Sequence, residues 1–382
     1  MVDYGFAYQH VDQEAHADAT DRFQMKSGQN SGSRFGLKGV EDLGNGLKVG
    51  FVLENGFTAD DGVMDNGGRL FGRESQLFVQ GDFGTLSFGR VGQLLSGLGS
   101  FGLMSKYSVF SGGWGSYTGG KFTNGGAWGR MDNTITYASP EFAGAKFYAQ
   151  YSFKLDSKQF DAYNNDVVTE ENKSKSDRYA SIAMTYDIGA LSLLIEGDWT
   201  QLGNIGPASE SSKWIREMDD SWGAMVAGTY DFGVMKLYAS GQWFKNTRTK
   251  FTDDWTTIYG LQGSFTDYVG AAGGANTLFV DGYAFNLGAD VPAFGGTFKA
   301  NIGYRYNECV RNSKNDVERW AVSAGYVYDL SKRTTVYGAA TYVQDDLGKL
   351  HTRTIAGGAS SPFKYVDDPS AIEAMVGLIH KF

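Results

Sequence analysis

Two lysines, Lys106 and Lys121, are the only charged residues in a glycine-rich stretch that runs from Val91 to Gly129. Its aromatic residues are Phe101, Tyr107, Phe110, Trp114, Tyr117, Phe122 and Trp128. Lysines without neighbouring acids attract anions where they line a narrow passage, and aromatic rings either pack a loop or stack against solutes. A loop this long is functional or disordered, and its aromatic content argues against disorder. We therefore expect a packed constriction loop at about residues 91–130 that narrows a pore.

Catalytic chemistry has little support in the sequence. No nucleophile-elbow or Cys–His motif is present, and the single Cys309 rules out an intrachain disulfide framework. The histidines lie far apart in the chain, at His10, His16, His351 and His380. We therefore expect no enzymatic activity and no cofactor.

Composition limits the class of protein. The chain has 382 residues, with 53 glycines, 15% aromatic residues, 20% charged residues and a net charge of −9. No apolar run approaches the roughly 18 residues that a membrane-spanning helix needs. A soluble all-β protein and a closed membrane barrel remain, because a barrel also satisfies every backbone group in lipid. The negative charge argues against nucleic acid as a partner. Met1 is followed at once by strand-like residues, so we expect a mature chain whose signal peptide has been removed.

Apolar and polar residues alternate with a period of two along most of the chain. In the segment 298–307, Phe298, Ile302 and Tyr304 share one face, while Lys299 and Arg305 lie on the other. Strict alternation predicts strands. The apolar face persists from one terminus to the other, which indicates a closed antiparallel barrel of about sixteen strands in one domain, residues 1–382.

Connections between the expected strands are alternately short and long. Short turns such as Asp82–Thr85 contain Asp and Gly, which favour tight hairpins. The long polar connections are expected at Asp12–Gly32, Thr58–Gly68, Asp156–Ser176, Leu202–Met218, Arg248–Thr277 and Asp345–Ser370. Short turns at one end and long loops at the other are typical of outer-membrane barrels.

Four segments carry a resemblance to a known family. They are Ser33–Lys48, Gly81–Arg90, Arg130–Gly144 and Val376–Phe382. In that order they resemble the second hairpin, the turn into the constriction loop, the return from it and the last strand of trimeric general porins of Gram-negative outer membranes. The resemblance implies a homotrimer in outer-membrane lipid and lipopolysaccharide that passes small hydrophilic solutes by passive diffusion. It also implies that Phe382 is the signal for membrane insertion, and that the strands near the termini and the loop Thr58–Gly68 make trimer contacts.

The family's basic strand residues face the constriction loop. In this sequence the resemblance assigns that role to Arg34, Lys38 and Arg130, and alternation points all three inward. Alternation also predicts that Glu74 rather than Arg73 faces the lumen, unless a bulge shifts the phase. General porins place carboxylates in the loop, and this loop has none. We therefore expect a preference for small anions, with Glu54, Glu74, Glu196 and Asp198 as acids that could offset it.

Other interpretations stay open at this point. The loop aromatics could form a binding track for a sugar or an organic acid, which would make the protein a solute-specific channel. A plugged barrel could serve as a structural or adhesive surface protein. Acidic pairs in the long loops could bind Ca²⁺ or simply be solvated. These pairs are Asp60–Asp61, Glu170–Glu171, Asp219–Asp220, Asp253–Asp254, Asp345–Asp346 and Asp367–Asp368.

Overall fold

The computed structural model of the chain describes residues 1–12, 20–111, 114–116, 118–121, 123–125, 129–161, 166–203, 220–248, 279–310, 312–346 and 370–382. Short helical turns occur at α1 (Asp65–Gly68), α2 (Met104–Tyr107) and η1 (Gly119–Lys121). Within these ranges, no helix has the length and apolar character needed to cross a membrane. Nearly all remaining regular structure is antiparallel strand, arranged as one 17-stranded sheet and a separate two-stranded ribbon.

The large sheet contains β1 (Val2–Asp12), β2 (Thr20–Ser27), β3 (Arg34–Gly44), β4 (Leu47–Gly56), β5 (Glu74–Gly81), β6 (Gly84–Gly92), β7 (Arg130–Ala138), β8 (Ala145–Ser152), β11 (Arg178–Ile188), β12 (Leu191–Gln201), β13 (Ser221–Asp231), β14 (Lys236–Arg248), β15 (Phe279–Ala293), β16 (Gly296–Cys309), β17 (Asn312–Ser331), β18 (Thr334–Asp346) and β19 (Ser370–His380). The ribbon consists of β9 (Phe160–Asp161) and β10 (Asp166–Val167).

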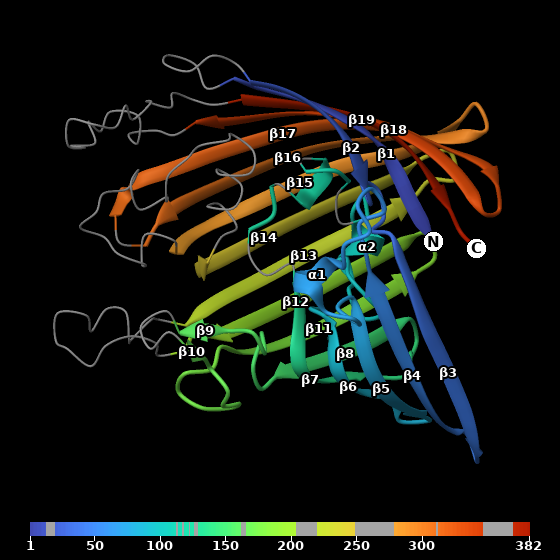
Figure 1. Cartoon of the computed structure of the whole chain (residues 1–382), viewed down its shortest axis with the longest axis vertical. Helices are drawn as coiled ribbons and strands as arrows, with labels where there is room; N and C mark the ends of the chain where they lie inside the picture. Colours follow the sequence, from blue (N-terminus) through green and yellow to red (C-terminus); the bar gives the residue numbers. More distant parts are fainter. Residues whose placement is uncertain are drawn as a thin grey trace.

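The strands of the large sheet follow one another around a ring (Figure 1). Consecutive strands pair from β3 to β8 and from β11 to β19, β8 pairs with β11, and β19 pairs with β1. β2 pairs with Tyr4–Val11 of β1, and Met1, which precedes β1, exchanges two backbone hydrogen bonds of 3.0 Å with Arg34 at the start of β3. β2 and β3 thus share one place beside β1. The seventeen strands therefore occupy sixteen positions around the ring. This arrangement confirms the predicted antiparallel barrel.

The two faces of the barrel wall differ in chemistry. Large apolar side chains on the outer face are exposed, including Ile182, Val226 and Leu287, whereas the alternate residues, such as Asn301 and Gln242, are buried on the inner face. A continuous apolar band is unfavourable in water and favourable in a lipid bilayer. The alternation therefore produces a wall whose outer face fits lipid and whose inner face fits water and the loop described below.

One strand was not expected. β2 lies within the predicted loop Asp12–Gly32, of which residues 13–19 fall outside the described ranges. Phe23 and Met25 of β2 are exposed on the outer side, 73% and 49%, and alternate with Arg22, Gln24 and Lys26. The short turns gather at one end of the barrel, on the right in Figure 1. The turn at Gly84 needs glycine, because its φ is +105° and a Cβ there would collide with the Ala138 carbonyl oxygen.

Candidate pore constriction

The chain between β6 and β7, residues 93–129, is referred to here as the constriction loop, and its described residues fold into the ring (Figure 1). Its neck is closed by hydrogen bonds from the Gln93 amide to the Gly129 carbonyl at 3.0 Å and from the Gly129 amide to Gln93 Oε1 at 2.7 Å. Glu74 on β5 is only 4% exposed and accepts a hydrogen bond of 3.1 Å from the Ser100 amide. Its carboxylate therefore lies inside the barrel and holds the start of the loop.

Two apolar clusters hold the constriction loop against the inner wall. In the first half of the loop, Leu94, Leu95 and Met104 pack with Leu194 and Met225 of the wall. In the second, the Trp114 ring lies between Phe110, with centroids 5.1 Å apart, and Tyr337 on β18, at 5.3 Å. Burial of large side chains on both halves supplies most of the loop's stabilisation, at about 1.5–3 kcal/mol per side chain.

Polar contacts then fix the loop to strands around the ring. Thr118 Oγ1 lies 2.8 Å from Thr341 Oγ1, and the Thr123 hydroxyl donates to Asn286 Oδ1 at 2.6 Å. Lys299 Nζ donates to the Val109 carbonyl at 2.9 Å. Because these partners lie on β15, β16 and β18, the loop is bound along its length, as a fixed constriction requires.

The aromatic residues of the constriction loop face the wall in the described part of the chain. Phe101, Tyr107, Phe110 and Trp114 are 8%, 2%, 0% and 3% exposed. Burial raises the pKa of the Tyr107 phenol above its ordinary value, so it remains a donor to the Leu193 carbonyl at 2.8 Å. These four rings pack the loop and present no open stacking track to solutes; Tyr117 lies outside the described residues.

The loop lysines contribute less positive charge than the sequence indicated. Lys106 Nζ lies 2.5 Å from Asp187 Oδ1 on β11, and the two side chains are each 43% exposed. This ion pair cancels much of the Lys106 charge. The Lys121 side chain is not among the described atoms. The strongest basic feature of the interior lies elsewhere, on β3, β6, β7 and the segment before β5.

Five arginines gather there around three acids, and we call them the arginine cluster: Arg34, Arg69, Arg73, Arg90 and Arg130. Arg73 Nε lies 2.6 Å from Glu54 Oε1, and Arg34 Nε lies 3.4 Å from Glu54 Oε2. One carboxylate on β4 therefore serves two guanidinium groups.

Arg130 uses neutral acceptors. Its Nε donates to the Arg73 carbonyl at 2.7 Å and its Nη1 donates to Asn66 Oδ1 at 3.2 Å. Both Arg73 and Glu74 lie inside the barrel, although alternation along a continuous strand allowed only Glu74 to face inward. Alternation fails for Arg73 because β5 begins at Glu74, so Arg73 belongs to the preceding irregular segment.

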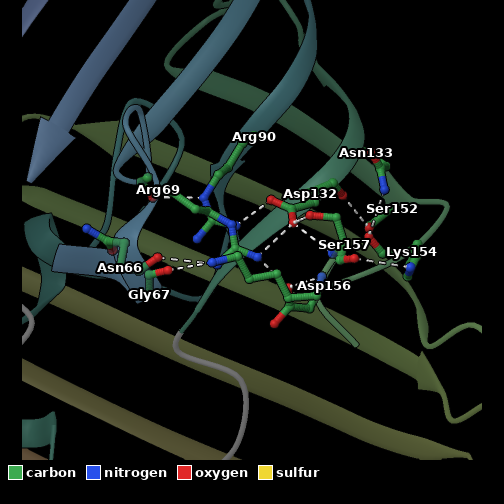
Figure 2. A network of polar contacts seen from close by, with 12 residues as sticks. Asn66, Gly67, Arg69, Arg90, Asp132, Asn133, Ser152, Lys154, Asp156 and Ser157 are labelled. Atoms are coloured by element: carbon green, nitrogen blue, oxygen red, sulfur yellow. Dashed lines mark hydrogen bonds and ion pairs between the residues drawn. The ribbon is translucent and has the colours of Figure 1, made fainter. Parts of the chain in front are cut away.

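Figure 2 shows the second half of the cluster, where Arg69 and Arg90 converge on Asp132 of β7. The Asp132 side chain is 9% exposed and also accepts a hydrogen bond of 2.8 Å from the Ser157 amide. Arg69 forms a further ion pair with Asp156. These contacts tie the connection that contains α1 to the connection after β8.

The arginine cluster carries an excess of positive charge. Four of its five guanidinium groups, all but that of Arg130, are paired with three carboxylates, Glu54, Asp132 and Asp156, so the cluster holds five positive and three negative charges. Lys38 lies on the inner face of β3, four residues after Arg34, and is exposed without joining the cluster. In a narrow passage with low-dielectric walls, such an excess concentrates anions.

Replacing Asp132 by asparagine is expected to increase the positive excess, because Arg69 and Arg90 would lose their shared carboxylate. We expect a shift of the reversal potential toward chloride and a loss of about 3 kcal/mol of stability, since a buried charge pair is broken. Asp156→Asn is the matched control, because Asp156 is 57% exposed and its contact with Arg69 should contribute at most about 1 kcal/mol. Equal effects of the two substitutions on thermal unfolding would contradict this assignment.

The acidic pairs of the loops differ in their surroundings. Asp61 accepts hydrogen bonds from Thr58 and from the Val63 amide, which lower the pKa of its carboxyl. Asp345 forms an ion pair of 2.6 Å with Arg319, and both side chains are fully buried. The described residues contain no group of three or more His, Cys, Asp or Glu that could hold a metal ion. The pair Asp253–Asp254, the pair Asp367–Asp368 and Asp219 lie outside the described ranges.

A closed antiparallel ring with an apolar outer face, a polar interior and an inward-folded loop defines an outer-membrane β-barrel channel. Comparison with known proteins makes the assignment more specific. Residues 3–348 match the model of the Gram-negative porin family, and the chain belongs to that family. It therefore forms an outer-membrane channel for the passive diffusion of small hydrophilic solutes.

Several relatives span the whole chain. An outer membrane porin of Bordetella pertussis is 30% identical over 100% of this chain and 93% of its own length. Outer membrane porin protein 32 of Delftia acidovorans is 28% identical over 100% and 92%. The solved anion-selective porin from Comamonas acidovorans superposes with a TM-score of 0.64 at 25% identity, over 100% of this chain and 98% of that one. These relatives are porins, which are channels and not enzymes.

Proposed function

We propose that this porin prefers small anions and that the arginine cluster selects them. The observation that carries the proposal is the excess of guanidinium over carboxylate groups, in which Arg34 and Arg73 share Glu54 while Arg130 has only neutral acceptors. The similar Comamonas acidovorans porin is described as anion-selective, which supports the same preference here. Transport is passive, without chemical conversion of the solute and without a cofactor.

Reversal potential in a planar bilayer under a potassium chloride gradient tests this proposal. We expect the reversal potential to have the sign of the chloride equilibrium potential. It should move toward zero as the salt concentration rises, because ions screen the fixed charge. A reversal potential with the sign of the potassium equilibrium potential would contradict anion preference. An absence of conductance would favour the plugged structural barrel, and saturable block by a sugar or a dicarboxylate would favour a solute-specific channel.

The chain is also proposed to assemble as a homotrimer in outer-membrane lipid and lipopolysaccharide. The outer faces of β1 and β3 expose Phe6, Phe35 and Leu37 at 42%, 59% and 63%, which suits a subunit contact. Of the loop Thr58–Gly68, the part near Val63 is exposed, whereas Asn66 binds Arg130 of its own barrel. We therefore assign the contact to the exposed part. Exposed acidic pairs such as Glu170–Glu171 are the proposed positions for Ca²⁺ bridges to lipopolysaccharide, and the exposed terminal Phe382 is the proposed insertion signal.

A further inference from the structure

A cavity of about 170 Å³ lies on the inner side of β12, β13 and β14, beside the neck of the constriction loop. Its polar lining consists of Gln93, Asp177, Asp198, Thr200, Ser221, Gln242 and Thr247. Among the described residues that line it, none is Lys, Arg or His. The cavity is therefore acidic, in contrast to the arginine cluster on the other side of the loop neck.

Negative charge at this wall is concentrated on β12. Asp198 and Glu196 lie two residues apart, so both side chains point to the inner face. Glu196 is 3% exposed, and neither of its carboxylate oxygens has a hydrogen-bond partner. Two like charges held this close in a poorly solvated region repel each other, and a bound cation would relieve the repulsion.

A second feature points to a ligand with hydrogen-bond donors. Gln242 on β14 lines the same cavity and is 4% exposed, yet neither its amide nitrogen nor its amide oxygen has a partner. Buried amides in folded proteins are nearly always hydrogen-bonded, so an orphaned one at a cavity wall indicates an absent partner. The Gln242 amide oxygen and the Asp198 carboxylate are both acceptors.

We propose that this cavity binds the primary ammonium group of a small organic cation. The ammonium group donates to Asp198 and to Gln242 Oε1. Leu155, Leu202 and Phe244 complete the lining and contact the alkyl part of the ligand. Its volume exceeds that of a bare metal ion, and the described residues contain no group of three or more His, Cys, Asp or Glu that could hold one. The site is independent of the anion preference proposed above, since it offers the opposite charge.

Isothermal titration calorimetry of the folded full-length protein in detergent, with ethylammonium chloride as the probe, tests the proposal. We expect saturable binding to the unmodified protein and a loss of affinity of about tenfold or more in Asp198→Asn, because a charge-assisted hydrogen bond is removed. Glu318→Gln is the matched control, since it removes one acid from the exposed face of β17 and should leave binding unchanged.

The substitution Gln242→Leu separates the contribution of the Gln242 hydrogen bond from that of the Asp198 charge. It should weaken ethylammonium binding while leaving the weaker attraction for tetramethylammonium, which has no N–H donor, unchanged. Absence of saturable ethylammonium binding would overturn the proposal. Equal affinity in the unmodified protein and Asp198→Asn would overturn it as well, as would displacement of ethylammonium by equimolar calcium, which would mark a metal site. None of these results depends on the ion selectivity of the channel.

Discussion

Replacing Arg73 by glutamate is expected to abolish the proposed anion preference of the channel. The side chain is 12% exposed and its Nε lies 2.6 Å from Glu54 Oε1. Glutamate at this position changes the local charge by two units and places two carboxylates together, which removes the positive excess of the arginine cluster. One unit charge acts on an ion about 4 Å away with about 1 kcal/mol in water, so the anion-to-cation permeability ratio should fall by at least about tenfold.

Reversal potentials across a salt gradient measure this change, and Arg73→Gln should give about half of it on a logarithmic scale. Lys332→Glu is the matched control, because it makes the same charge change at an exposed short turn between β17 and β18. Unaltered selectivity in Arg73→Glu, with a normal conductance, would remove the arginine cluster as the selecting element. A shift of equal size in Lys332→Glu would show that overall charge is what matters.

Alternation in the sequence was enough to predict the barrel. A period of two decides which face each residue occupies wherever a strand is regular, because a slip of one residue would place polar groups in lipid. Glu74 is an example, as it lies at the start of β5 and points inward with Gln76. β2 carried the same signal in Phe23 and Met25, but its charged residues are typical of a loop, and the strand was missed.

The arginine cluster could be predicted only in part, because three of its members lie where the strand period is broken. Arg69 and Arg73 belong to the irregular connection before β5. Arg90 lies on β6 between Gly89 and Val91, where the pairing with β7 shifts in register and Gly89 has a φ of +128°. Such a bulge turns the next side chain to the other face, so Arg90 reaches Asp132. Bulges depend on the neighbouring strand, and a single strand's sequence does not reveal them.

The loop lysines illustrate a different limit. Their positive charge was evident, but the ion pair between Lys106 and Asp187 joins residues far apart in the chain. The net charge at a constriction depends on every residue that the fold brings close to it. Counting the charges of one loop alone therefore overestimates the positive charge that acts on a passing ion. The burial of the loop aromatics could not be predicted for the same reason, because their partners, such as Tyr337, lie on strands that are distant in the sequence.

Removing the Glu373 side chain is expected to release the tip of the constriction loop. Glu373 on β19 is fully buried; its Oε1 accepts a hydrogen bond of 2.8 Å from the Ser116 amide and its Oε2 one of 2.6 Å from Gln9 Nε2. Lys26 Nζ lies 3.8 Å from the same carboxylate. Glu373→Ala leaves the buried Gln9 side-chain amide and the partly buried Ser116 backbone amide without this acceptor, at about 1–3 kcal/mol each. With the tip freed, the single-channel conductance should rise and its current noise should increase.

Glu373→Gln distinguishes loss of the tether from loss of the charge, because glutamine still offers an acceptor to the Ser116 amide. It should keep the original conductance and quiet current, while Glu373→Ala should not. Circular dichroism of both variants checks that the barrel has formed. If Glu373→Ala conducts with the original amplitude and noise, the tip is held by its other contacts and Glu373 is not the tether. The contacts of Trp114 with Phe110 and Tyr337 and the hydrogen bond between Thr118 and Thr341 would then fix the constriction without Glu373.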